Sequence, residues 1–174
     1  MTRYTYCYRC VAMLFFLFTL NAAHAQSSDN QSNKVYKNSI NLEMLGHGFG
    51  YTLSYERVFV ANDFFRTTGQ IGFAYYGTNS DATPLWIPIT ISQLKPLGNG
   101  EFLEIGAGRM IRSHMPLFGD ASGKGGLRME EWIMRLGLRM QPPGKRFQFR
   151  IAYTPFLRPS GITHWGAMGL GVQF

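Results

Sequence analysis

The sequence predicts an all-β fold, namely an eight-stranded antiparallel transmembrane β-barrel with an N-terminal signal peptide. After residue 25, apolar and polar residues alternate with a period of two in eight segments, which Gly, Pro, Asn and Asp separate. No stretch there has 18 consecutive apolar residues, which excludes a helical membrane span. The chain is rich in Gly (20), Phe (14) and Tyr (9), and only 16% of its residues are charged, which favours strands and turns over disorder.

Residues 1–25 are predicted to be a signal peptide. Their first ten residues contain two arginines, and an apolar run over residues 11–20 follows that is too short for a membrane span. An Ala-His-Ala cleavage signal then ends at Ala25. Cleavage removes both cysteines and lowers the formal net charge from +7 to +5, because both arginines leave. Residues 26–37 are polar and predict a flexible leader, and residues 38–174 form the predicted barrel domain.

The first four predicted strands span residues 39–45, 51–57, 64–76 and 85–94. Each places apolar residues at every second position, which is the pattern of a strand with two different faces. In chain order, the apolar faces consist of Ile40, Leu42 and Met44; Tyr51, Leu53 and Tyr55; Phe65, Ile71, Phe73 and Tyr75; and Leu85, Ile87, Ile89 and Ile91.

The last four predicted strands span residues 101–110, 131–141, 146–156 and 165–174. The first of them is the weakest, and the second is the clearest. Their apolar faces consist of Leu103, Ile105 and Ala107; Trp132, Met134, Leu136, Leu138 and Met140; Phe147, Phe149, Ile151 and Tyr153; and Met168, Leu170, Val172 and Phe174. Eight strands in about 150 residues make the smallest common closed barrel.

The connections between the strands predict how the barrel is oriented. With the N-terminus in the periplasm, residues 58–63, 95–100 and 142–145 form short inward turns rich in Pro, Gly or Asn. The longest connection, residues 111–130, then faces outward. Short inner turns and longer outer loops are typical of membrane barrels.

The distribution of small and bulky residues separates a membrane barrel from a soluble one. Most glycines of the strands share the polar face with long charged side chains, as a narrow lumen requires. The apolar face is bulky and carries aromatic residues near strand ends, which is typical of the girdles at the two bilayer interfaces. These aromatic residues are Tyr51, Phe65, Tyr75, Trp132, Phe147, Tyr153, Trp165 and Phe174. We therefore favour the membrane barrel over a soluble periplasmic barrel that carries a lipid or another ligand.

Three pieces of the sequence resemble a known group of proteins. They are N-S-I-N-L-E (38–43) with Y-T-L-S-Y-E-R (51–57), Q-P-P-G-K-R-F-Q-F-R-I-A-Y-T-P (141–155) and the glycine-rich closing segment 165–174. With them, nearly all of the mature chain resembles the small outer-membrane β-barrel proteins of Bacteroidetes-type bacteria. This resemblance implies the barrel fold and the bacterial outer membrane, but these families are largely without an assigned activity. The terminal Phe174 resembles the aromatic C-terminus that the barrel-assembly machinery recognises, which implies this machinery as a partner during biogenesis.

Charged side chains on the polar face form the predicted site. They are Glu43, Glu56, Arg66, Glu104, Arg135, Arg139 and Arg150. Unpaired charges in a narrow lumen would be costly, whereas charges that hydrogen-bond to one another can fill it, and the planar guanidinium can bridge several carboxylates. We expect a charge network that plugs the lumen; the alternative is a pathway for ions or small solutes.

The remaining basic residues suggest contacts with lipids rather than with nucleic acid. They are scattered, and the sequence contains no basic helix and no recognisable nucleic-acid module. Near the outer rim, Arg109, Arg112, Lys124 and Arg128 could meet the anionic headgroups of outer-membrane lipids, including lipopolysaccharide. The alternative is a solvated loop without a function.

The expected role is structural or a surface interaction through the outer loops, mainly residues 111–130, by a monomer that is not an enzyme. The main alternative is a lipid A-modifying deacylase or acyltransferase, because some eight-stranded outer-membrane barrels have such activities. Its candidate residues are His47, Ser113, His114, Asp120 and His164. A nucleophile and its base must lie within hydrogen-bond reach of each other, which sequence spacing cannot show. We expect no cofactor and no metal site, since the mature chain has no cysteine and lacks ligand spacings such as H-x-x-x-H.

Overall fold

The computed structural model describes residues 36–48, 50–75, 85–113 and 127–174, which all belong to one unit, Asn33–Phe174. The predicted signal peptide, most of the predicted leader and most of the predicted outer loop 111–130 lie outside the described residues. No helix in the described ranges is long and apolar enough to cross a membrane.

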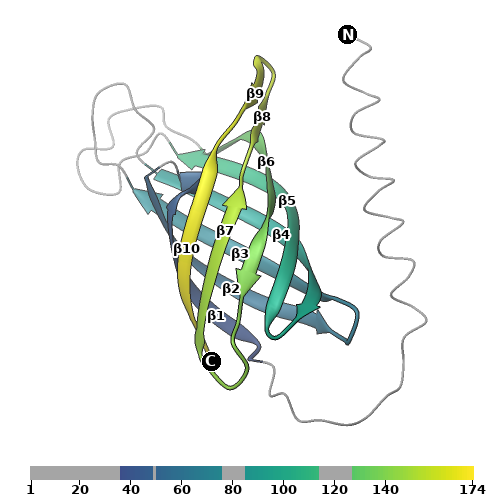
Figure 1. Ribbon diagram of the computed structural model, residues 1–174. Coiled ribbons are helices and arrows are strands. Elements are labelled where there is room, and N and C mark those ends of the chain that lie inside the picture. Colours follow the sequence, from purple (N-terminus) through teal and green to yellow (C-terminus); the bar gives the residue numbers. More distant parts are fainter. Residues whose placement is uncertain (1–35, 49, 76–84, 114–126) are drawn as a thin grey trace. The chain divides into compact units, whose positions relative to one another are not determined.

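The described chain forms one closed antiparallel barrel (Figure 1). Its strands are β1 (Asn38–Leu45), β2 (Tyr51–Ala61), β3 (Arg66–Tyr75), β4 (Leu85–Gly98), β5 (Glu101–Ser113), β6 (Leu127–Met140), β7 (Phe147–Tyr153), β8 (Phe156–Arg158), β9 (Gly161–Thr163) and β10 (Gly166–Gln173). A short 3-10 turn, η2 (Gly46–Gly48), follows β1. Consecutive strands pair from β1 to β6, β10 joins β1 to β7, and the β6–β7 pairing closes the ring.

The last two strands of the barrel are interrupted, so that ten segments make eight barrel strands. The β6–β7 ladder ends at the pair Leu136–Tyr153, and β6 pairs again with β8 from Ile133–Phe156. Pro155 lies in the gap and has no N–H to donate, although its carbonyl accepts from Met134 N at 3.1 Å. The predicted strand 146–156 is therefore wrong at this end, where β8 and β9 form a separate hairpin that extends the barrel (Figure 1). Four other strands are longer than predicted by three or four residues, since β2 continues to Ala61, β4 to Gly98, β5 to Ser113, and β6 begins at Leu127.

The two ends of the barrel differ. The terminal end contains Tyr36, Phe174 and the connections 62–65, 99–100 and 141–146, and Asn38 N donates to Phe174 O there at 3.1 Å. The loop end contains η2, the β8–β9 hairpin and the strand ends that flank residues 76–84 and 114–126.

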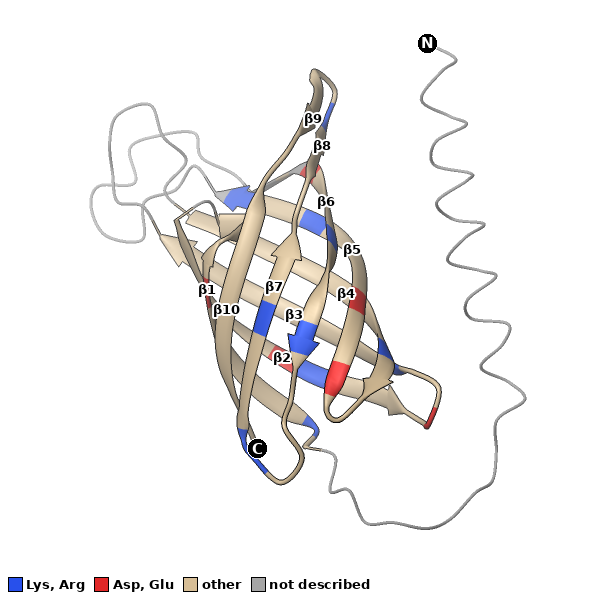
Figure 2. Ribbon diagram, viewed as in Figure 1, with Lys and Arg blue, Asp and Glu red and all other residues tan. Residues whose placement is uncertain are grey.

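The alternating pattern separates an apolar outer wall from a polar interior. Outward side chains such as Leu42 (51% exposed), Ile151 (50%) and Leu170 (67%) face away from the barrel, whereas Glu43, Arg135 and Gln148 are buried. Figure 2 shows charged residues along the strands that enclose this interior. Four exposed phenylalanines lie near the terminal end, namely Phe59, Phe64, Phe147 and Phe174. The exposed aromatic residues Tyr51, Phe73, Trp132 and Tyr153 lie near the loop end.

Trp165 is the exception among the aromatic residues predicted for the outer girdles. It packs against an apolar cluster inside the barrel, formed by Met110, Ile133 and Phe156. Trp165 directly precedes β10 and shares the parity of Ala167 and Gly169, which face the interior. The prediction that it belongs to the outer girdle, made from its aromatic side chain, was therefore wrong.

Candidate functional site

The centre of the barrel interior is a cluster of three arginines and three glutamates. Arg139 on β6 is its middle: Nε lies 3.0 Å from Glu104 Oε2, and Nη2 lies 2.9 Å from both Glu104 Oε1 and Glu56 Oε2. Arg139 Nη1 also donates to the other oxygen of Glu56. The three side chains are 0%, 1% and 3% exposed, so these paired hydrogen bonds are shielded from water.

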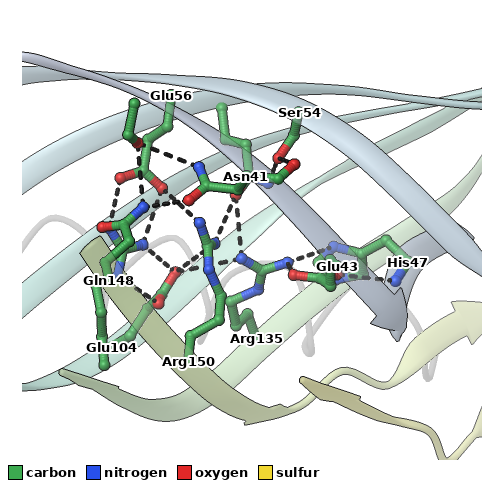
Figure 3. A network of polar contacts seen from close by, with 12 residues as sticks. Asn41, Glu43, His47, Ser54, Glu56, Glu104, Arg135, Gln148 and Arg150 are labelled. Carbon is green, nitrogen blue, oxygen red and sulfur yellow. Dashed lines mark hydrogen bonds and ion pairs between the residues drawn. The ribbon is translucent and has the colours of Figure 1, made fainter. Parts of the chain in front are cut away.

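Arg135, four residues before Arg139 on the same face of β6, connects this centre to β1. Its Nη2 lies 2.6 Å from Glu43 Oε2, and its Nη1 lies 3.4 Å from Glu104 Oε1 (Figure 3). The same Nη1 donates to Gln70 Oε1 at 3.0 Å. Glu104 therefore bridges two arginines that come from the same face of β6.

Arg150 on β7 is the third arginine, and it is the register partner of Arg139. Like charges directly opposite each other on neighbouring strands are unfavourable unless they are compensated. Arg150 lies 3.4 Å from Glu56 Oε2 and 3.8 Å from Glu104 Oε1, so both carboxylates that bind Arg139 also face Arg150. On the neighbouring strand, a Cβ at Gly169 would lie 3.1 Å from Arg150 Cγ, which shows how little room this arginine has.

Arg66 is the predicted site residue that the structure places apart from the cluster. Its Nη1 donates to Gln141 Oε1 at 3.2 Å, and its guanidinium lies 4.5 Å from the ring centroid of Phe102. Within the described ranges, no ion pair joins Arg66 to a carboxylate. The other six predicted charges thus meet in one formally neutral cluster, with Arg66 on its terminal side.

His47 in η2 extends the cluster toward the loop end. Leu45 and Gly46 have positive φ values of 60° and 67°, which turn the chain inward after β1. Since Met134 O can only accept, His47 Nε2 donates to it at 3.0 Å, and Nδ1 accepts from Arg135 Nη2 at 3.3 Å. Burial, together with the neighbouring Arg135, lowers the pKa of His47 to about 4. His47 was a candidate base in an outward loop, and the structure corrects this placement: the side chain is 2% exposed and both ring nitrogens are engaged.

Toward the terminal end, a layer of amides continues the polar filling. Gln148 donates to Asn41 Oδ1 and, at 3.2 Å, to Ser39 Oγ, while its own Oε1 accepts from Gln173 at 3.0 Å and from Gln141 at 2.6 Å. Neutral residues carry no charge signal, so this layer was not predicted from the sequence. Its only signal was the position of these residues on the polar faces of their strands.

Toward the loop end, the filling becomes apolar. Met110, Ile133 and Phe156 are completely buried, and Trp86 and Trp165 pack against them. Beside this cluster, Glu131 Oε2 lies 3.0 Å from Arg112 Nη2, and Glu131 Oε1 lies 2.5 Å from Arg158 Nε. The interior is therefore layered into amides, charges and apolar side chains, of which only the charges were predicted from the sequence.

The four arginines and lysines predicted for the outer rim have different environments. Arg112 is paired with Glu131 and lies 3.9 Å from the ring centroid of Trp86. Arg109 lies over the ring of Trp132 at 4.6 Å and donates to Met129 O at 3.2 Å. Lys124 and the side chain of Arg128 lie outside the described residues.

The candidate catalytic residues are not shown to form a catalytic site. His47 is buried beside Arg135, whereas His164 is exposed and contacts the hydroxyl of Tyr153. His114, Asp120 and the side chain of Ser113 lie outside the described residues. The part of the chain that the structure covers contains no group of three or more His, Cys, Asp or Glu residues that could hold a metal ion.

No family model and no curated protein matches the sequence. Among solved structures, the chain is similar to the N-terminal β-barrel domain of Pseudomonas aeruginosa OprF, with a TM-score of 0.52 and 12% identity over 79% of this chain and 96% of that chain. It is also similar to the outer membrane protein Ail of Yersinia pestis, with a TM-score of 0.46 and 15% identity over 80% of this chain and 100% of that chain. At this identity, the OprF domain supports the fold alone, and together with the strand order it confirms the predicted eight-stranded barrel.

Proposed function

We propose that this protein is a bacterial outer-membrane β-barrel with a lumen that its own side chains close, and that its role is structural or a surface interaction. The observation that carries this proposal is the inverted distribution of polarity. Arg135, Arg139 and Arg150 are at most 1% exposed, while apolar side chains such as Leu170 (67%) and Phe147 (71%) cover the outer wall. Such a wall would aggregate in water but suits a bilayer, which a barrel can cross because it leaves no strand edge unpaired.

This polarity also separates the proposal from a soluble ligand carrier. A carrier would need an apolar cavity, whereas the middle of this interior holds a charge cluster and an amide layer. Cell fractionation tests the location, and a folded barrel is expected to migrate differently on a gel before and after heating. Recovery of the protein in the soluble periplasmic fraction would overturn both the location and the role.

The proposed closure of the lumen predicts that the protein does not conduct ions. Charged side chains at 0–3% exposure block the middle, and the apolar cluster of Met110, Ile133 and Phe156 blocks the loop end. In planar lipid bilayers, the purified protein should therefore give no steady conductance. Stable and selective single-channel currents would show an open pathway and refute the closed lumen.

The loop end would face the cell exterior, because the terminal end carries the short turns. Outer-membrane lipids, including lipopolysaccharide, are the proposed contacts there, with Arg109 over Trp132 as the described residue best placed for a headgroup phosphate. We also propose that the barrel-assembly machinery is a partner during biogenesis and that the protein comes from Bacteroidetes-type bacteria. N-terminal sequencing of the protein from membranes tests signal-peptide removal, for which we expect residue 26 as the first residue.

The protein is proposed not to be an enzyme. The described histidines have structural surroundings, since His47 binds Arg135 and His164 contacts Tyr153. Mass spectrometry of lipid A from cells with and without the protein tests the rival lipid-modifying activity. An acylation pattern that changes with the protein would favour the enzyme.

A further inference from the structure

Exposed cations that have no acidic partner gather at the terminal end of the barrel. They are Lys37, Arg57, Lys95, Lys145 and Arg146, which we call the basic collar. In the part of the chain that the structure describes, no ion pair joins any of them to a carboxylate. Asp63 and Glu101 are the exposed acids at this end, so the collar retains an excess of positive charge.

The loop end has a different charge arrangement in its described residues. Arg112 and Arg158 both pair with Glu131, and Arg109 is engaged by Trp132 and by the carbonyl of Met129. With the central cluster formally neutral, the free positive charge of the described chain lies mainly at the terminal end. This asymmetry requires an explanation, because repulsion within the collar is not relieved by the protein itself.

The position of the collar on the wall indicates what could relieve it. Arg57 lies on the outward face of β2 with Tyr55 (39% exposed) and Phe59 (64% exposed) two positions to either side. Lys95 on β4 has Leu97 (54% exposed) two positions away. A cation that projects from an apolar wall next to aromatic side chains lies where a bilayer changes from acyl chains to headgroups.

The turn between β6 and β7 repeats this arrangement. Lys145 and Arg146 immediately precede Phe147, which is 71% exposed. On the opposite side of β10, the backbone of Lys37 lies next to Val58, the residue that follows Arg57, because the carbonyl of Lys37 accepts from Val58 N at 2.8 Å. Three places at this end thus combine a cation with an exposed apolar side chain.

We propose that the basic collar selects anionic phospholipids in the leaflet that surrounds the terminal end, by binding their phosphate groups. This inference rests on the proposed membrane location and adds a lipid class and a binding surface to it. A polymer of the cell wall is less well matched, because Arg57 and Lys95 project sideways from the wall among apolar side chains. Attraction to an anionic membrane surface corresponds to about five-fold in affinity for each such cation.

The natural tryptophans allow each end to be measured separately. Trp86 and Trp165 pack inside the barrel, whereas Trp132 is 39% exposed on the wall near the loop end. The double substitution Phe59→Trp with Trp132→Phe moves the lipid-facing tryptophan next to Arg57. Quenching of tryptophan fluorescence by phosphatidylglycerol or phosphatidylcholine with brominated acyl chains then gives the relative affinity for the two lipids at each end.

We expect the terminal-end reporter to prefer brominated phosphatidylglycerol by about five-fold or more at low salt, and this preference should weaken at high salt. Adding Arg57→Gln and Lys95→Gln should bring the preference close to one, while Arg57→Lys should retain it. As the matched control, these substitutions should not change the quenching of Trp132 at the loop end in a chain with Phe59 intact.

Two results would overturn the inference. The terminal-end reporter could show equal quenching by the two lipids, or a preference that persists without Arg57 and Lys95. Loss of binding to purified peptidoglycan on the same substitutions, with no lipid preference, would assign the collar to the cell wall instead. Failure of the unsubstituted protein to enter vesicles would instead refute the proposed membrane location, and is scored separately by the heat-dependent gel shift.

Discussion

Glu104 is the residue on which the charge cluster should depend most. It is 1% exposed, and its two oxygens receive Arg139 at 3.0 and 2.9 Å, with Arg135 at 3.4 Å and Arg150 at 3.8 Å. The substitution Glu104→Gln keeps the shape but removes the charge, so that three arginines then share Glu43 and Glu56. The NH2 group of the new amide also donates hydrogen bonds at a position where a carboxylate oxygen accepted them, and it faces guanidinium groups that are donors themselves.

The expected cost is about 3–5 kcal/mol of unfolding free energy, the range for removing one partner of a buried ion pair. Urea unfolding of the protein in lipid vesicles, followed by tryptophan fluorescence, measures it. Glu101→Gln is the matched control, because Glu101 begins the same strand and is exposed; its effect should stay within about 0.5 kcal/mol.

A double-mutant cycle tests whether the loss comes from the cluster itself. Arg139→Met removes the arginine closest to Glu104, so the double substitution should cost at least about 1 kcal/mol less than the sum of the two single ones. If Glu104→Gln behaved like Glu101→Gln, or if the two losses were additive, the cluster would not be an interdependent network.

Two further predictions concern close packing and pH. A Cβ at Gly171 would lie 2.0 Å from Asn41 Oδ1, so Gly171→Ala should lower the unfolding free energy by about 1–3 kcal/mol, whereas Gly166→Ala, with no atom nearer than 3.9 Å, should be nearly neutral in the same urea assay. His47, in the turn outside the strands, has its pKa lowered to about 4, so the unfolded chain takes up a proton before the folded one. The contribution of His47 to the free energy of unfolding should therefore be complete above pH 6.5 and should fall by up to about 3 kcal/mol as the pH falls to about 4. Urea unfolding across this range should show a smaller loss of stability for His47→Gln than for the unsubstituted protein. Equal losses in the two proteins would contradict the assignment of a neutral ring.

The strand number and the two faces were predictable because the side-chain period of a strand is two. Every second residue of β1 or β10 must point the same way, so that Ile40 and Leu170 share the wall, and Glu43 shares the interior with Gly169. This rule holds only while the strand is continuous. At Pro155 the ladder between β6 and β7 is interrupted, and the predicted strand 146–156 was wrong there. The T-P dipeptide was the available signal, since proline cannot donate to a ladder. For Trp165 the alternation itself favours the interior, where the structure places it, and the girdle prediction was wrong because it followed residue type.

The pairing within the interior could not be predicted in the same way. Alternation places Arg66 and Arg139 on the same kind of face, but it does not give the height at which each tilted strand presents its side chains. The register sets this height: Arg139 is opposite Arg150 in the middle of the barrel, whereas Arg66 begins β3 at the terminal end and meets Gln141 and Phe102. The same alternation therefore applies to Arg139, which lies in the neutral cluster, and to Arg66, which lies at the terminal end of the barrel.

The same reasoning explains why the closing layers differ along the barrel axis. At the terminal end, the interior meets water or lipid headgroups, and amides such as Gln148 can exchange partners there without leaving a charge unpaired. At the loop end, Met110, Ile133 and Phe156 separate the cluster from the exterior and deprive its ion pairs of water. Removing this apolar layer should thus expose Arg135 and His47 to solvent before it opens the amide layer, which makes the loop end the side from which the closed lumen would first become hydrated.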